Sequence, residues 1–161
     1  PDIVYTTSGL GGIPGDVQFL VDAWSTNLGV DVEVRQLAPD AYFYTLYEEL
    51  DNLFDFGWIA DYPDPENFLD VLLHSEAAEN NVGHYSNAEY DRLLEEARTE
   101  TDTGRRMALY QQAEQILVDD AGIIPLYHAP DYVLTKPFIE GFAIGPLGIP
   151  LLQNVTIGDR N

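Results

Sequence analysis

The feature that most constrains the fold is an alternation of strand and helix patterns in the first sixty residues. Apolar, β-branched runs that predict strands occupy Ile3–Thr7, Val30–Leu37 and Leu53–Ala60. Between them, two helices are predicted, one from about Asp16 and one after Pro39. The apolar face of each is formed by Val17, Leu20, Val21, Trp24 and Leu28 in the first helix and by Tyr42, Phe43, Leu46, Tyr47 and Leu50 in the second. Strands that alternate with helices favour a parallel or mixed sheet covered by helices on both faces. The sequence therefore predicts an α/β fold.

Three further helices are predicted beyond this region. One spans Glu66–Leu73, one follows a capping box made by Ser86 and Glu89, and one runs from about Thr103 to Asp119. The side chains expected to face the core are Tyr90, Leu93, Leu94 and Ala97 in the second of these helices, and Met107, Tyr110, Ala113, Ile116 and Leu117 in the third.

The last forty residues are predicted to be extended. Gly122–Ala129 and Tyr132–Thr135 have the composition of strands, and Asn154–Ile157 is strand-like at the end of a tail rich in Gly and Pro. No internal repeat or low-complexity segment interrupts the chain.

The composition excludes several classes of function. The formal net charge is -21, from 28 acidic residues against 7 Lys and Arg, and such a surface repels nucleic acid, so no nucleic-acid partner is expected. The chain has no Cys, which excludes disulfides, thiol catalysis and Cys-ligated zinc. We expect no cofactor and no metal. The charge leaves open an ordinary soluble surface, a halophile's solvated coat and a surface for cations.

Ligands of open α/β sheets sit at the carboxyl ends of strands, which directs attention to two loops. In Ser8–Gly15, the third glycine of a dinucleotide-binding pattern falls on Pro14 and no basic residue is near, so nucleotide binding is not favoured. In Asp61–Pro65, an acid follows directly after a predicted strand on which Trp58 alternates with Phe56. An aromatic ring beside an acid suits the capture of a small solute, and ordinary core packing is the alternative.

Five carboxylates cluster around this loop, and two of them could serve as the acid and base of a hydrolase if they faced one cleft. In a chain this acidic, however, such a cluster also arises by chance. The five are Asp55, Asp61, Asp64, Glu66 and Asp70.

The segment Gly57–Leu69, GWIADYPDPENFL, resembles the signature stretch of the family 5 extracellular solute-binding proteins, which include the peptide, dipeptide and nickel binders of ABC importers. Other segments that are similar to this family follow in the family's order, so the resemblance covers nearly the whole chain. They are Asn27–Val32, Asn80–Asn87, Tyr90–Leu94, Arg105–Glu114 and Ile124–Tyr127.

The resemblance implies a two-lobed protein that closes on its ligand. Residues 3–140 would form the C-terminal lobe of a type II periplasmic-binding-protein fold, with a mixed sheet flanked by helices. Residues 141–161 would form a tail that returns to the missing N-terminal lobe. The partners would be that lobe, a peptide or small-molecule ligand and the transmembrane subunits of an ABC importer. The location would be periplasmic or extracellular, with a lipoprotein anchor in the full-length protein.

The resemblance also implies the site. The acid at the position of Asp61 would pair with the α-amino group of a peptide ligand, and the adjoining strand edge would bond to the ligand backbone. The ligand-binding residues would be Asp61, Trp58, Ile59, Ala60 and Tyr62, and none would be catalytic. Oligosaccharides and nickel complexes are the alternative ligands in this family, and a hydrolase is the alternative class. The isolated chain is expected to bind ligand weakly and to self-associate through its uncovered cleft face.

Overall fold

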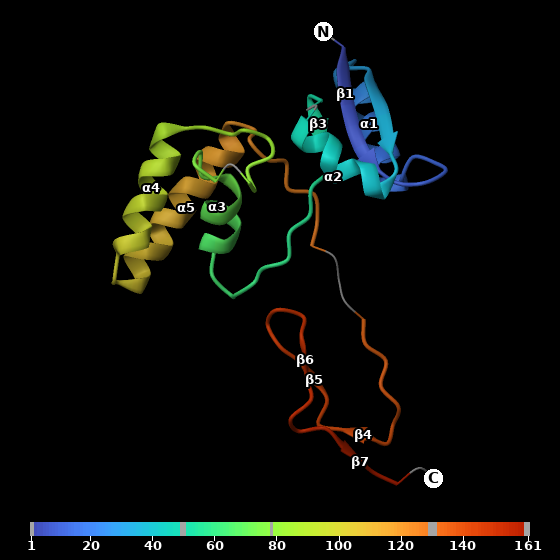
Figure 1. Cartoon of the computed structure of the whole chain (residues 1–161), viewed down its shortest axis with the longest axis vertical. Coiled ribbons are helices and arrows are strands. Elements are labelled where there is room, and N and C mark those ends of the chain that lie inside the picture. Colours follow the sequence, from blue (N-terminus) through green and yellow to red (C-terminus); the bar gives the residue numbers. More distant parts are fainter. Residues whose placement is uncertain (1, 49–50, 78, 129–131, 160–161) are drawn as a thin grey trace. The chain divides into compact units, whose positions relative to one another are not determined.

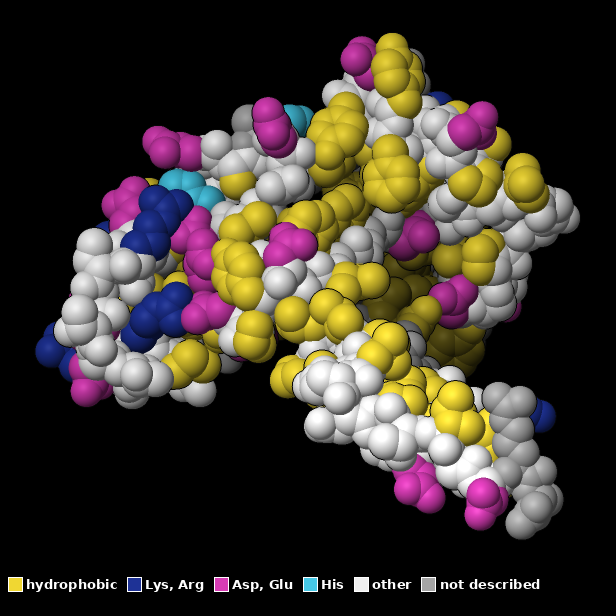
Figure 2. Space-filling model, turned by 60° about the horizontal axis from the view of Figure 1, so that its bottom comes forward, with side chains coloured by type: hydrophobic (Ala, Val, Ile, Leu, Met, Phe, Trp, Pro, Cys, Tyr) yellow, Lys and Arg dark blue, Asp and Glu magenta, His cyan; other side chains and the backbone are white. Residues whose placement is uncertain are grey.

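The computed structural model of the chain describes residues 2–48, 51–77, 79–128 and 132–159 (Figure 1). It divides into two units, Pro1–Gly57 and Trp58–Asn161, which are described separately below. Within the described ranges, no helix is both long and apolar enough to span a bilayer. Acidic side chains are spread over the face drawn in Figure 2, whereas Lys and Arg appear at a few places only.

The first unit is a three-stranded parallel sheet with two helices. Its elements are β1 (Ile3–Ser8), α1 (Gly15–Leu28), β2 (Val32–Leu37), α2 (Pro39–Glu48) and β3 (Leu53–Phe54). The strand order is β2-β1-β3, and both pairings are parallel. The predicted alternation of strands and helices is therefore confirmed in this unit.

The core of the first unit lies where the two helices meet β1. Its buried apolar side chains are Tyr5, Val17, Tyr42 and Leu46, and the ring of Tyr5 meets that of Trp24 edge-on at 6.4 Å. Three other apolar residues predicted to face inward, Leu28 of α1 and Phe43 and Tyr47 of α2, are exposed. A fourth, Leu50, lies outside the described residues.

Strand β3 is much shorter than predicted. It covers Leu53–Phe54 and not Leu53–Ala60, because its only strand neighbour in the described sheet is β1. Tyr5 pairs with Leu53 and Thr6 pairs with Phe54, so β1, which ends at Ser8, has no residues left to pair beyond position 56. Residues 57–60 therefore have no strand to pair with, residues 55 and 56 also lie outside the strand, and the predicted alternation of Phe56 with Trp58 on one strand is wrong.

The second unit begins with three helices, α3 (Glu66–Leu73), α4 (Ala88–Thr99) and α5 (Thr103–Asp119). The bounds of α3 and α5 are those predicted. Helix α4 is capped by Asn87, whose side-chain oxygen accepts hydrogen bonds from the backbone N–H groups of Glu89 and Tyr90, so the prediction that Ser86 is the cap is wrong.

The helices enclose a continuous apolar cluster. Tyr90 is fully buried at its centre, and its hydroxyl donates a hydrogen bond of 2.8 Å to the backbone oxygen of Leu69. The buried stripe of α5 starts from Arg106, so Met107 lies about a quarter turn away from it and is exposed, contrary to prediction. The other members of the cluster are Leu93, Leu94, Ala97, Tyr110, Ala113 and Leu117, and Ile116 packs against them while half-buried, so the remaining predicted core residues are confirmed.

The predicted strands in Gly122–Ala129 and Tyr132–Thr135 do not form within the described residues 122–128 and 132–135. Strand propensity reflects how well a residue fits a pleated, half-buried surface, and the described residues give these segments no such surface. Ile123 packs against the apolar cluster, but other apolar side chains of these segments stay in solvent: Tyr132 is 88% exposed and Leu134 is 99% exposed. Ala129 itself lies outside the described residues.

The tail forms two small antiparallel sheets, β4 (Ile139–Glu140) with β7 (Thr156–Ile157) and β5 (Ala143–Ile144) with β6 (Pro150–Leu151). The predicted strand Asn154–Ile157 is thus confirmed at its last two residues. Gly141, which follows β4, has a φ of 72°, and a Cβ there would lie 2.0 Å from the backbone oxygen of Asn154. Only glycine fits this turn.

Candidate ligand-binding site

The five predicted site residues lie together in the second unit, in the segment Trp58–Tyr62 that leads into α3. Ile59 is 82% exposed, and the side chains of Asp61 and Tyr62 are exposed as well, whereas Trp58 and Ala60 are half-buried. The segment therefore presents an acid, an aliphatic side chain and a phenol to solvent on a short stretch of irregular backbone.

A buried amide holds this segment in place. Asn67, in the first turn of α3, is 1% exposed, and its Oδ1 accepts a hydrogen bond of 2.8 Å from Nε1 of Trp58. The same oxygen accepts a second hydrogen bond of 3.1 Å from the backbone N–H of Asp61. Asn67 lies within the family-like segment Gly57–Leu69, but no pattern of spacing reveals this role.

Asp64 stabilises the loop through hydrogen bonds of its side chain. Its two carboxylate oxygens accept bidentate hydrogen bonds of 2.7 and 2.9 Å from Arg106, and Oδ1 also accepts the backbone N–H of Glu66. The Arg106 guanidinium in turn stacks over the ring of Tyr110, at 4.8 Å from its centroid. Hydrogen bonding to Arg106 holds the pKa of Asp64 below its usual value.

Two other acids of the cluster are also paired. Asp70 is buried and accepts two hydrogen bonds of 2.6 Å from Arg98. Glu66 accepts a hydrogen bond from the hydroxyl of Tyr62, which raises the pKa of that phenol. Both carboxylates are thus engaged in contacts that stabilise the unit. Because they are already paired, they are unsuited to act as the acid and base of a hydrolase.

Asp61 differs from these neighbours. Among the described residues, its carboxylate has no hydrogen-bond or ion-pair partner, although its backbone N–H is fixed by Asn67. Trp58 and Tyr62 do not enclose it, since it remains exposed and the hydroxyl of Tyr62 is bonded to Glu66. Among the described residues, Asp61 thus has a free carboxylate on a backbone that Asn67 holds in place.

The remaining acid of the predicted cluster, Asp55, belongs to the first unit. It follows β3 directly, whereas Asp61 does not, so the argument from strand ends applies to Asp55 and was wrong for Asp61. Oδ1 of Asp55 and Oγ1 of Thr7 are buried and lack hydrogen-bond partners within the described part of the chain. Burial raises the pKa of Asp55.

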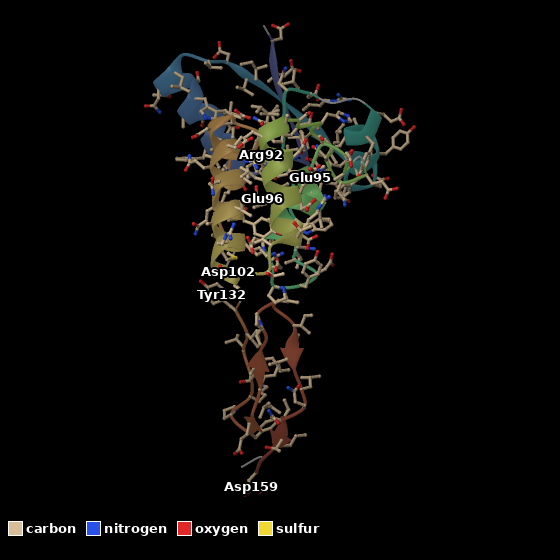
Figure 3. The ribbon with its side chains drawn as sticks, turned by 90° about the vertical axis from the view of Figure 1, so that its left-hand side faces the viewer. Arg92, Glu95, Glu96, Asp102, Tyr132 and Asp159 are labelled. Carbon is tan, nitrogen blue, oxygen red and sulfur yellow. The ribbon has the colours of Figure 1, made fainter. Side chains whose placement is uncertain are left out.

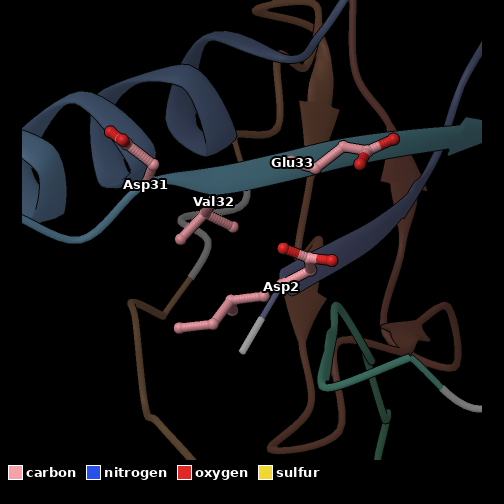
Figure 4. A pocket seen from close by; sticks show the side chains of 5 residues that line it. Asp2, Asp31, Val32 and Glu33 are labelled. Carbon is pink, nitrogen blue, oxygen red and sulfur yellow. The ribbon is translucent and has the colours of Figure 1, made fainter.

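An open hollow at the other end of the sheet is a weaker candidate. Figure 4 shows it beside the amino ends of β1 and β2, where Asp2, Asp31 and Glu33 line it together with Ile3 and Val32. Ligands of open α/β sheets occupy the opposite, carboxyl ends of the strands. The three acids line a wide opening and not an enclosed pocket, so this hollow is not the site.

Charged side chains on the surface of α4 pair with one another. Figure 3 labels Arg92, Glu95 and Glu96 on this helix, and Arg92 is paired with Glu96 at 2.8 Å and with Glu89 at 2.7 Å. Within the described ranges, no group of three or more His, Cys, Asp and Glu side chains is arranged to hold a metal ion.

Comparison with known proteins identifies relatives of one kind. No protein-family model matches the chain. It is 38% identical over 78% of its length to the probable deoxycholate-binding periplasmic protein YgiS of Escherichia coli, and 33% identical over 85% of its length to the oligopeptide-binding protein OppA of Bacillus subtilis. Among solved structures, the murein tripeptide binding protein MppA of Escherichia coli matches 98% of the chain with a TM-score of 0.81 and 26% identity.

The fold is therefore that of the type II periplasmic binding proteins, which confirms the predicted α/β class. The parallel pairing lies in the first unit, and the antiparallel pairing lies in the small sheets of the tail. The chain belongs to the family 5 extracellular solute-binding proteins, as its segment Gly57–Leu69 predicted.

The proteins that the chain matches are named for binding, which confirms the prediction of a family without enzymatic activity. The chain spans 23% and 25% of the two curated relatives described above, and 31% of the MppA structure.

Proposed function

We propose that the complete protein captures peptides for an ABC importer, and that Asp61 accepts the α-ammonium group of the ligand. Relatives that the chain matches are named as oligopeptide-, di/tripeptide- and murein peptide-binding proteins, which supports peptide as the ligand class. Residues 3–140 would be the C-terminal lobe and residues 141–161 a tail that packs on the other lobe. The match to about a quarter of each relative supports a chain that forms one part of a longer protein.

The observation that carries the anchor is that Asp61 combines an unpaired carboxylate with a backbone that Asn67 holds, whereas the acids around it are paired. Asp64, Glu66 and Asp70 each have a partner close by, while the carboxylate of Asp61 has none among the described residues. A free peptide carries one ammonium group at a fixed position relative to its backbone. An unpaired carboxylate on a held backbone is the complementary group, and the pair gains strength where water is excluded.

The backbone next to the anchor suits a peptide of any sequence. Trp58, Ile59 and Ala60 are not part of a strand, so their N–H and C=O groups are not used in a sheet ladder. A peptide bound along this segment would form hydrogen bonds through its own backbone, and its side chains would contribute little to recognition. This mode of binding gives broad specificity.

The rest of the protein would supply the enclosure that this chain lacks. Exposed apolar side chains occur along the described extended segment after α5, among them Ile124, Leu126, Tyr132 and Leu134. Their exposure supports a role as the contact surface for residues outside this chain, because a soluble protein rarely leaves a contiguous apolar patch uncovered. By itself the chain would self-associate through these residues, which sedimentation velocity across a concentration series would detect.

A second ligand class has support from one relative. The name of YgiS specifies deoxycholate, a ligand without an ammonium group, so the family-like segment alone does not settle the ligand. Oligosaccharides and nickel complexes are also alternatives. With any of these ligands, the role in import would stand and the role of Asp61 would fall.

Native mass spectrometry of the full-length protein, purified without refolding, tests the proposal. We expect a ladder of co-purified peptide masses, and we expect these masses to be lost in Asp61→Asn. A single non-peptide mass that persists in Asp61→Asn would overturn both the peptide assignment and the anchor. The relatives are named as periplasmic proteins, so we propose a periplasmic or extracellular location with a lipoprotein anchor, which fractionation and lipid labelling of the full-length protein would check.

A further inference from the structure

The structure assigns a positioning role to Asn67: it holds the Asp61 anchor and the Trp58 indole in one arrangement before a ligand arrives. The inference rests on the proposed function of Asp61, and it concerns a residue that would not touch the ligand. Asn67 is 1% exposed, so its contribution to binding must pass through the groups that it holds.

The geometry of this contact is specific. One oxygen, Oδ1 of Asn67, accepts from a side-chain donor at position 58 at 2.8 Å and from a backbone donor at position 61 at 3.1 Å. An amide oxygen has two lone pairs, so these two donors fill its capacity. The indole of Trp58 and the backbone of Asp61 are thereby tied to the same atom and cannot move independently.

Asn67 is itself held firmly, so it is a fixed point and not a mobile tether. Its backbone N–H donates to the oxygen of Asp64 at 3.1 Å, and Asp64 is bound by Arg106 of α5. Two residues further along α3, Leu69 belongs to the apolar cluster of the unit. The loop that carries Asp61 is therefore connected to the core through a short series of buried or half-buried contacts.

The consequence for binding follows from preorganisation. A ligand that meets an anchor already in position does not have to order it, whereas a free loop must be ordered at the expense of affinity. Removal of the acceptor would leave two N–H donors unsatisfied and free the segment from 58 to 61. Affinity should fall only for ligands that use the Asp61 carboxylate.

Two substitutions of Asn67 distinguish the effect of its hydrogen-bond acceptor from the effect of its packing. Asn67→Leu keeps the branched outline of the side chain and removes the acceptor, while Asn67→Asp keeps an acceptor oxygen at the same place. Both are made in the full-length protein, alone and combined with Asp61→Asn. The probe is an equimolar library of synthetic tripeptides with free amino termini, and the same library N-acetylated is the matched control. Calorimetry gives the affinities, and ¹⁵N-indole NMR follows the Nε1–H signal of Trp58.

We expect Asn67→Leu to weaken binding of the free library by about tenfold or more. Asn67→Asp should stay within about threefold of the parent protein. In the Asp61→Asn background, and with the acetylated library, Asn67→Leu should have little further effect, because the anchor is already absent. The Trp58 indole signal should shift upfield in Asn67→Leu and stay near its original position in Asn67→Asp.

The inference is overturned if Asp61→Asn weakens the free library while Asn67→Leu does not. It is equally overturned if Asn67→Leu weakens the free and acetylated libraries alike, or adds its full effect to Asp61→Asn, since a general structural role would do this. Failure of the proposed function has a different signature, in which Asp61→Asn itself leaves the affinity for the free library unchanged. The positioning role then has no anchor to act on and falls with it, while the indole shift still reports whether the contact with Asn67 exists.

Discussion

Replacement of Asp61 by Asn tests the anchor most directly, because it removes one negative charge and keeps the shape of the side chain. The size of the effect depends on how far the rest of the protein encloses the pair. Two unit charges about 3 Å apart attract by about 1.4 kcal/mol in a water-like medium and by about 5.5 kcal/mol at the effective dielectric constant of partly buried pairs. In the described structure Asp61 is exposed, so the lower figure is the minimum.

Enclosure raises the expected loss. Loss of one partner of a buried pair costs about 3–5 kcal/mol, since the remaining charge stays desolvated without compensation. We therefore expect Asp61→Asn to reduce affinity for peptides with a free amino terminus at least tenfold, and by more than a hundredfold if the other lobe closes over the site. The measured loss would report the degree of enclosure around the anchor, which this chain by itself does not show.

Isothermal titration of the full-length protein with a tripeptide library measures this loss. The matched control is Glu114→Gln, which removes the same charge from an exposed position on α5 and should leave affinity unchanged. N-acetylated peptides should bind the parent protein as weakly as free peptides bind Asp61→Asn. A change below about threefold in Asp61→Asn, or an equal loss in Glu114→Gln, would refute the reasoning from a local charge pair.

The other predictions concern the scaffold around the site. Arg98→Ala should lower the free energy of unfolding by about 3 kcal/mol in urea denaturation, because it leaves the buried carboxylate of Asp70 unpaired, and a loss below 1 kcal/mol would contradict this. Asn87→Ala should cost about 1 kcal/mol in the same assay and Ser86→Ala only a few tenths, and the reverse order would contradict the assigned cap. The folded-state pKa of Asp64 is lowered, so its stabilisation should be present at neutral pH and be lost as pH falls below about 4. Urea titrations from pH 7 to pH 3 should show a smaller acid-induced loss of unfolding free energy in Asp64→Asn than in the parent protein. An equal loss in both proteins would contradict this stabilising role of Asp64.

The helices were predictable because their signals are local. Helix α3 starts directly after Pro65, and the stripe of buried residues on α5 follows from spacing alone, so the bounds of both helices are those predicted. The strands were less predictable because a strand needs a neighbour that the sequence does not specify. In the register of β3 with β1, residues beyond position 56 have no strand residue to pair with, so β3 cannot extend to Ala60, and Tyr132–Thr135 forms no strand among the described residues.

The site shows a similar limit. The family-like segment located Asp61, but spacing could not show which acids nearby are structural, because their partners come from far along the chain. Arg106 is 42 residues from Asp64, and Arg98 is 28 residues from Asp70. Such pairings arise only when α3, α4 and α5 pack together.

An unpaired acid is not by itself a signal in this protein. With 28 acidic residues and 7 Lys and Arg, most carboxylates cannot have a basic partner, and their exposure follows from the composition. What separates Asp61 is its support: a buried amide, that of Asn67, fixes its backbone, and the same amide holds an aromatic ring beside it. A carboxylate that belongs merely to a solvated surface has no need of such a contact. Asp61 is therefore selected as the anchor by its unpaired carboxylate together with the way its backbone is held, and charge alone would not have selected it.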